Sequence, residues 1–264
     1  MRMLLMALMG LLVAAPALAQ KLESREVEYT HGDVKLRGLL VFDPSQAGKR
    51  PAVLIFPEWW GRNDYAKARA EQLAQAGYIA FAADMYGDAK TTTRPEEAQA
   101  LTRPLYADGM LMRERAAAAL AVLKSQPNVD GAKVAAIGYC FGGANALELA
   151  RSGAEVAAVV SFHGSLKTAS PEDAKNIRGK VLVLTGGADP LVPGEEREAF
   201  IKEMEEGKVD AQMVVYSGAK HSFTNPAADR AGMPPVGYDK RADERSWEAM
   251  MDLFRGTIGA GKKS

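Results

Sequence analysis

The sequence predicts an α/β fold with a mostly parallel central sheet and helices on both faces of that sheet. Continuous apolar runs such as PAVLIFP (51–57) have the length and composition of strands buried on both faces. Such runs alternate with stretches that carry apolar residues at helical spacing, as in DYAKARAEQLAQAGY (64–78). Repeated strand–helix units favour a parallel sheet, because each helix returns the chain across one face.

The first elements follow this pattern in order. Residues 34–44 alternate between apolar and polar side chains, which is typical of a strand. The runs at 51–57 and 78–84 predict two buried strands, and Gly77 fits the C-terminal stop of the helix between them. A polar loop is expected over 85–97.

The later elements repeat the alternation. A helix is expected over 108–126, ended by Pro127, and the run KVAAIGY (133–139) is a further buried strand with its own helix at 142–153. The remaining strands are expected over 155–164, 180–187 and 211–218, and the remaining helices over 194–206 and 240–258. In such sheets, functional residues gather where the strands end.

The N-terminus is typical of an export signal. Arg2 precedes an uninterrupted apolar run over 3–15, and Ala17-Leu18-Ala19 has the small-x-small form that signal peptidase cuts. The run is too short for a membrane span of about 20 apolar residues. We therefore expect a signal peptide over 1–19, a periplasmic location and no stable membrane anchoring, with an uncleaved anchor as the alternative.

The expected mature chain, residues 20–264, has the length of one large α/β domain and shows no break in composition. Lys plus Arg and Asp plus Glu both number 33, so there is no bulk charge to attract nucleic acid. The three histidines, His31, His163 and His221, have no metal-ligand spacing, and His31 is expected in a turn. We therefore expect no metal site, no other cofactor and no nucleic-acid partner.

Cys140 is the single cysteine of the chain, so it cannot form an internal disulfide. In an exported protein, a lone thiol indicates intermolecular pairing or a reactive group; a small buried apolar residue is the alternative. Cys140 lies in the pattern G-x-C-x-G between a strand and a helix, which is the nucleophile elbow with cysteine in place of serine. The following helix N-terminus favours a thiolate, and the Phe141 N–H can donate to an oxyanion.

Asp189 and His221 follow two later strands, and the chain order nucleophile, acid, histidine is that of α/β-hydrolases. A turn-forming Asp-Pro and an exposed loop histidine are the alternatives for these two residues. Glu58 follows a buried strand and has no obvious packing role. Near Cys140 a charged Glu58 would raise the thiol pKa and protect the thiol from oxidation; a solvated loop glutamate is the alternative.

The segments FPEWWG, ADMYG, GYCFGG, GADPLVP and HSF together resemble the dienelactone hydrolase family of α/β-hydrolases, and the similarity covers nearly the whole expected mature chain. The resemblance implies an α/β-hydrolase fold and a Cys140–Asp189–His221 triad. It also implies that Glu58 lies beside the resting thiol and that Trp59 provides a second oxyanion N–H beside Phe141.

The sequence departs from this family at two substrate-binding positions. The founding members carry arginines there that hold the substrate carboxylate, whereas this chain has Gly87 and Asn225. Specificity for a dienelactone acid is therefore not expected. Arg62 and Arg94 are candidate replacements, although the sequence does not determine where they point.

Aromatic residues near the strand ends predict an apolar pocket, with core packing as the competing explanation. The candidate substrate-binding residues are Trp60, Tyr86, Tyr139, Phe223 and His163, the last of which also fits a hydrogen-bonded residue at the rim of the sheet. The proline-rich segment 224–243 either covers the site or is only a surface connection.

These features predict a hydrolase that cleaves a small ester or lactone through an acyl-thioester on Cys140, like a carboxymethylenebutenolidase. His221 would act as base and then acid, oriented by Asp189. A catalytically silent binding protein is one alternative, which the intact set of Cys, Asp, His and Glu disfavours. A thiol redox or scavenging protein is another, which the lack of a second cysteine disfavours.

Overall fold

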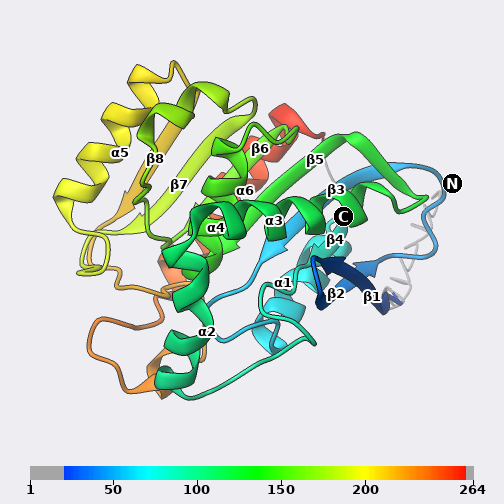
Figure 1. The fold of residues 1–264 in the computed structure, drawn as a ribbon, viewed down its shortest axis with the longest axis horizontal. Coiled ribbons are helices and arrows are strands. Elements are labelled where there is room, and N and C mark those ends of the chain that lie inside the picture. Colours follow the sequence, from blue (N-terminus) through cyan, green and yellow to red (C-terminus); the bar gives the residue numbers. More distant parts are fainter. Residues whose placement is uncertain (1–20, 260–264) are drawn as a thin grey trace, which may run out of the picture.

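The computed structural model describes residues 21–259, so the predicted signal peptide over 1–19 lies outside the described residues. The described residues build one eight-stranded sheet in the order β1-β2-β4-β3-β5-β6-β7-β8 (Figure 1). Its strands are β1 (Glu23–His31), β2 (Val34–Phe42), β3 (Arg50–Phe56), β4 (Ile79–Ala82), β5 (Val129–Tyr139), β6 (Ala158–Phe162), β7 (Lys180–Gly186) and β8 (Ala211–Tyr216). Strands β3 to β8 are parallel, and β2 is antiparallel to both neighbours, which confirms the predicted mostly parallel sheet.

Helices cover both faces of the sheet, as predicted. One face carries α1 (Asp64–Gln75) and α6 (Lys240–Thr257), and the other carries α2 (Pro95–Ala107), α3 (Gly109–Lys124), α4 (Phe141–Arg151) and α5 (Gly194–Glu206). Two short 3₁₀ helices complete the elements, η1 (Pro171–Asn176) and η2 (Ala228–Ala231). No helix within residues 21–259 is long and apolar enough to cross a membrane.

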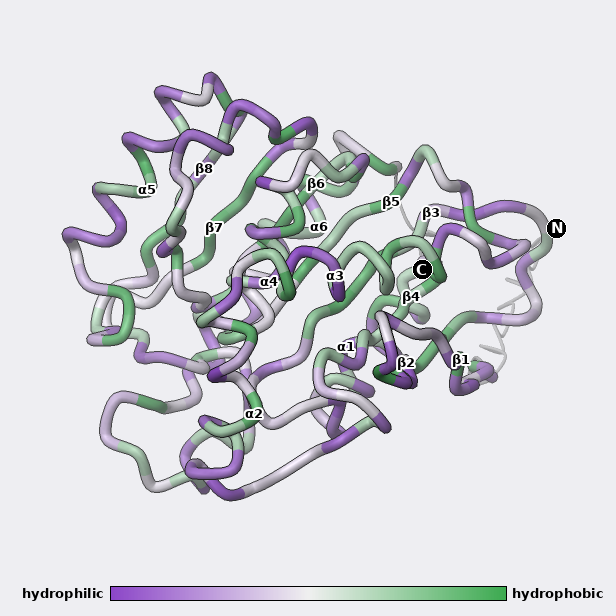
Figure 2. Tube along the Cα trace, viewed as in Figure 1, coloured by the Kyte–Doolittle hydropathy of each residue, from purple (hydrophilic) through white to green (hydrophobic). Residues whose placement is uncertain are grey.

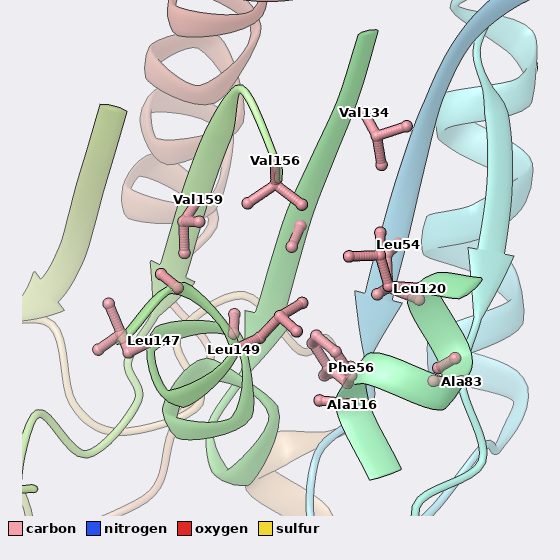
Figure 3. Close-up of a cluster of buried hydrophobic side chains, with 14 of the residues drawn as sticks. Leu54, Phe56, Ala83, Ala116, Leu120, Val134, Leu147, Leu149, Val156 and Val159 are labelled. Carbon is pink, nitrogen blue, oxygen red and sulfur yellow. The ribbon is translucent and has the colours of Figure 1, made fainter. Parts of the chain in front are cut away.

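The core consists of two apolar layers, one on each face of the sheet. Figure 2 shows the central strands as predominantly hydrophobic, which is what burial on both faces requires. In Figure 3, Leu54 and Phe56 of β3 lie next to Ala116 and Leu120 of α3. On the opposite face, Phe254 of α6 is fully buried in the second layer. Both layers are continuous along the sheet, so they hold the strand ends in a fixed arrangement.

Two elements were not predicted. β1 is an edge strand whose residues are mostly exposed or half-buried, so it carries no apolar run, and it pairs with β2 across the Gly32-Asp33 turn. His31 is the last residue of β1 and directly precedes that turn. Helix α2 begins at Pro95, inside the predicted loop 85–97, because proline fits the first turn of a helix.

The turn at Cys140 brings three backbone segments into close contact. A Cβ atom on Gly142 would lie 2.0 Å from the Phe56 carbonyl oxygen at the end of β3. A Cβ atom on Gly138 would lie 1.9 Å from the carbonyl oxygen of Gly142 itself. Both distances are far below real Cβ contacts, so only glycine lets α4 start this close to β3 and β5.

We expect Gly142→Ala to lower the free energy of unfolding by about 1–3 kcal/mol, because the new methyl group meets backbone that cannot move aside. The direction of this change in stability is informative, because a Gly to Ala substitution within a helix normally stabilises the protein. Gly131→Ala, in β5, is the control because its Cβ would meet nothing within 4 Å. Urea denaturation measures both variants, and equal midpoints would contradict the steric argument.

Candidate active site

Cys140 lies at the junction of β5 and α4 in a strained backbone conformation. It has φ +53° and ψ −117°, in the region of positive φ that non-glycine residues rarely adopt. The residue directly precedes the first turn of α4, so its side chain stands at the positive end of the helix dipole. Its side chain is partly exposed in a cavity, whereas Tyr139 and Phe141 on either side are buried. This is the geometry of the predicted nucleophile elbow.

Asp189 and His221 form a buried pair on the loops after β7 and β8. His221 Nδ1 lies 2.8 Å from Asp189 Oδ2, and both residues are at most 5% exposed. The other carboxylate oxygen, Oδ1, accepts the Leu191 N–H at 2.8 Å. Because an ionised carboxylate only accepts hydrogen bonds, Nδ1 carries the proton and Nε2 is left as the basic atom of the neutral ring.

His221 and Cys140 line the same cavity. The Nε2 atom of His221 is buried and has no hydrogen-bond partner within the described residues. Burial opposes protonation of the ring, but the negative charge of an ionised Cys140 and the hydrogen bond to Asp189 outweigh it and raise the pKa of His221 to about 10. The charge state of the imidazole is therefore coupled to that of the Cys140 thiol.

Phe141 and Trp59 border the elbow, as the oxyanion prediction requires. Phe141 is the first residue of α4, so its N–H is among those that have no partner inside the helix. Trp59 follows β3, whose end is pressed against Gly142, and its carbonyl accepts a hydrogen bond from the Tyr86 hydroxyl at 2.9 Å. Both residues line the same cavity as Cys140.

Glu58 is buried and hydrogen-bonded to the loop that carries His221. It is 2% exposed, and its Oε2 accepts a hydrogen bond from Asn225 Nδ2 at 2.7 Å. Oε1 is buried without a hydrogen-bond partner in the described part of the chain, where no hydrogen bond joins Glu58 to Cys140. Burial raises the pKa of Glu58, and the Asn225 hydrogen bond opposes the shift only in part. The alternative of a solvated loop glutamate is wrong, because the side chain of Glu58 is buried.

A cavity of about 660 Å³ opens in front of Cys140, a size that suits a small organic molecule. Its wall is largely apolar. The apolar lining residues are Trp59, Trp60, Tyr106, Phe141, Leu191, Val192, Ala227, Ala228, Ala231, Met233, Pro235 and Val236. Apart from His221, Arg230 is the one titratable nitrogen in the wall formed by residues 21–259, and no carboxylate lines it.

Of the predicted substrate-binding residues, Trp60 lines the cavity and the other four lie outside its wall. Tyr139, Phe223 and His163 are at most 1% exposed, because the apolar layer beside α1 and α6 takes up these side chains. Tyr86 stacks on Phe141 with ring centroids 5.8 Å apart and supports the wall from behind. The core-packing explanation therefore applies to the aromatic rings, and the hydrogen-bonded alternative describes His163.

The segment 224–243 covers the site. Asn225, η2 and the residues through Val236 line the cavity, and Val236 pairs with His221 in a β-bridge. Helix α2 supplies Thr102 and Tyr106 to the same cavity, and in Figure 1 the orange segment and α2 lie at the end toward which the parallel strands point. The sequence analysis missed Tyr106 because it assigned no element to α2.

The candidate arginines are engaged elsewhere. Arg62 is ion-paired with Glu26 and donates to the Arg37 carbonyl, and Arg94 is an exposed residue bound to Glu96. Neither lines the cavity. Among the residues that the structure describes, no group of three or more His, Cys, Asp or Glu side chains is arranged to hold a metal ion.

We expect Glu58→Gln to raise the free energy of unfolding, and the gain to grow as the pH rises. Both states are protonated below the unfolded-state pKa of about 4.3, so the carboxyl costs nothing there. Above it the unfolded chain ionises freely while burial keeps the folded-state pKa higher, so stability is lost as pH rises toward that folded value. Glutamine stays neutral and keeps an acceptor for Asn225.

Urea denaturation at several pH values between about 4 and 8 measures this difference. Glu206→Gln, which removes an exposed glutamate ion-paired with Lys202, controls for the loss of one negative charge. A gain for Glu58→Gln that is absent, or that is independent of pH, would contradict the assignment.

Comparison with known proteins agrees with this geometry. The model of the Dienelactone hydrolase family matches residues 36–258. An Aquifex aeolicus protein named "Putative carboxymethylenebutenolidase" is 30% identical over 234 residues, which cover 87% of this chain and 96% of that protein. The solved structure of the dienelactone hydrolase-like promiscuous phosphotriesterase P91, from metagenomic libraries, is 45% identical with a TM-score of 0.86, covering 89% of this chain and 98% of its own.

A dienelactone hydrolase from Anabaena variabilis is 26% identical with a TM-score of 0.64, and the match covers 88% of this chain and 98% of that one. These matches confirm the predicted α/β-hydrolase fold. With the family model spanning both the elbow and the Asp189–His221 pair, the chain belongs to the dienelactone hydrolase family, whose members are hydrolases of the carboxymethylenebutenolidase type.

Proposed function

We propose that this protein hydrolyses small, uncharged esters or lactones through an acyl-thioester on Cys140. The observation that carries the proposal is the arrangement of three groups at one cavity. A strained elbow presents Cys140. The buried Asp189–His221 pair is joined by a 2.8 Å hydrogen bond and leaves His221 Nε2 without a hydrogen-bond partner among residues 21–259. These positions support the roles of Cys140 as nucleophile, His221 as base and Asp189 as the group that orients the base.

The reaction follows from these positions. His221 Nε2 accepts the thiol proton, and the Cys140 sulfur attacks the substrate carbonyl carbon to give a tetrahedral oxyanion. The Phe141 and Trp59 N–H groups stabilise that oxyanion. The carbon–oxygen bond to the alcohol then breaks as imidazolium returns the proton to it, leaving a thioester. Water, deprotonated by His221, adds to the thioester carbonyl, and the carboxylic acid departs as the sulfur regains its proton.

Apart from the exposed Arg230, the residues of the cavity wall favour uncharged substrates. Gly87 and Asn225 stand where the founding members of the family carry carboxylate-binding arginines, and Asn225 is bonded to Glu58. Apolar aromatic surfaces of Trp59, Trp60 and Tyr106 fit the body of a neutral ester. The P91 relative is described as a promiscuous phosphotriesterase, and phosphotriesters are also uncharged esters. We therefore include them in the proposed substrate range and do not propose specificity for dienelactone.

We expect the protein to hydrolyse short-chain 4-nitrophenyl esters, a neutral lactone or a phosphotriester, and Cys140→Ala to lose about 10³-fold or more of kcat/KM. Stopped-flow release of nitrophenol and mass spectrometry of the quenched reaction test this, because the acyl group should be found on the chain's single cysteine. Thermal unfolding of Cys140→Ala verifies that the variant is folded. Wild type that is as inactive as Cys140→Ala across the panel would overturn the proposal and leave a silent binding protein.

We also propose that the protein acts in the bacterial periplasm after removal of residues 1–19, which rests on Arg2, the apolar run and the Ala17-Leu18-Ala19 motif. N-terminal sequencing of protein from a periplasmic extract is expected to begin at Gln20. Changing Ala17 and Ala19 to Arg should block the cut. A chain that retains Met1 and stays in the cytosolic fraction would contradict the proposal.

A further inference from the structure

His163 lies beneath the site and not in the wall of the cavity. It directly follows β6, is 0% exposed and has φ +41°, an uncommon conformation for a residue with a side chain. Burial and the nearby positive charges of His221 and Arg69 lower the pKa of His163 well below its usual value. The ring is therefore neutral, with one nitrogen that donates and one that accepts a hydrogen bond.

The hydrogen bonds of the His163 ring show which of its two nitrogens carries the proton. The backbone N–H of Cys140 donates to His163 Nδ1 at 3.1 Å and also to the Phe162 carbonyl at 3.0 Å. Because Nδ1 accepts, Nε2 carries the proton and donates to the hydroxyl oxygen of Thr224 at 2.7 Å. A single imidazole thus connects the elbow of Cys140 to Thr224.

Thr224 belongs to the loop that carries the catalytic base. It follows His221 after Ser222 and Phe223, is 0% exposed, and its hydroxyl also lies 2.6 Å from the Tyr65 hydroxyl. Arg69 donates to the Thr224 carbonyl and is ion-paired with Asp243, so the loop is held from α1 and α6. 

The His163 ring also packs against that loop directly. Its centroid lies 5.3 Å from the ring of His221 and 5.1 Å from the ring of Phe223, in edge-on arrangements. The imidazole therefore contacts the loop after β8 through the rings of His221 and Phe223 and the hydroxyl of Thr224. It contacts the turn at Cys140 through the Cys140 N–H.

We propose that His163 is a positioning residue, which sets the separation between Cys140 and His221 through its hydrogen bonds to the Cys140 N–H and the Thr224 hydroxyl. The inference rests on the proposed function of this site. Both Cys140 and His163 have positive φ, and such strain persists only where the surroundings hold it in place. The bridge supplies that restraint between two loops that join different strands.

Thr224→Val tests the bridge, because valine keeps the shape of threonine and removes the hydroxyl. We expect kcat and the rate of iodoacetamide alkylation of Cys140 to fall about 10-fold, since small misplacements of catalytic groups are costly, while KM stays unchanged. Thr224→Ser retains the hydroxyl and should behave as wild type. Thr185→Val is the matched control, because Thr185 is equally buried and its hydroxyl has no hydrogen-bond partner within residues 21–259.

His163→Asn carries the same test if Thr224→Val does not fold. Its side-chain oxygen can accept the Cys140 N–H, but its amide is too short to reach Thr224. Where both single variants fold, their combination should lose less activity than the sum of the two separate losses, because both changes remove the contact between His163 and Thr224.

Rates of Thr224→Val equal to those of Thr185→Val, or additive losses in the double variant, would overturn the bridge. Alkylation needs no substrate, and Cys140 is the single cysteine, so this readout still decides the bridge if no ester is hydrolysed. Failure of the positioning role and failure of the proposed function are therefore distinguishable.

Discussion

The close approach of three backbone segments at the Cys140 turn is the constraint on which the site depends. The end of β3 lies against Gly142, and the end of β5 at Gly138 lies against the first turn of α4. No side chain fits at either glycine, so the packing sets the distance between the elbow and the loop that begins with Glu58 and Trp59. The Cys140 thiol, the N-terminus of α4 and the loop that carries Trp59 are thereby brought together by the packing of the backbone.

The other half of the site is held by buried polar contacts. Asp189 and His221 come from loops after neighbouring strands, and their hydrogen bond needs both loops to be fixed. Thr224 and Arg69 hold the second loop against α1 and α6, and Asn225 on the same loop holds Glu58. Since unpaired polar groups are costly to bury, these contacts specify one arrangement more strongly than apolar packing does.

Much of the fold could be predicted because burial on both faces leaves a strong mark in the sequence. The strands β3 to β7 appear as apolar runs, and α5 begins and ends at the predicted residues 194–206. The edge strand β1 and the helix α2 were missed because each lies at the periphery and buries few residues. Periodicity reports burial, so elements with little burial leave little signal.

The sequence by itself determined the candidate catalytic residues and their order: a cysteine between glycines after a strand, followed by an acid and a histidine. A sharp turn after a strand needs small neighbours, so the glycines on either side of Cys140 make the turn recognisable from the sequence alone. Only the tertiary structure decided which aromatic and polar side chains face the substrate. Trp60 lines the cavity, whereas Tyr139, Phe223 and His163 are buried, and Glu58 is bonded to Asn225. The direction of a side chain beyond a strand end depends on contacts between distant segments, and no local pattern encodes those contacts.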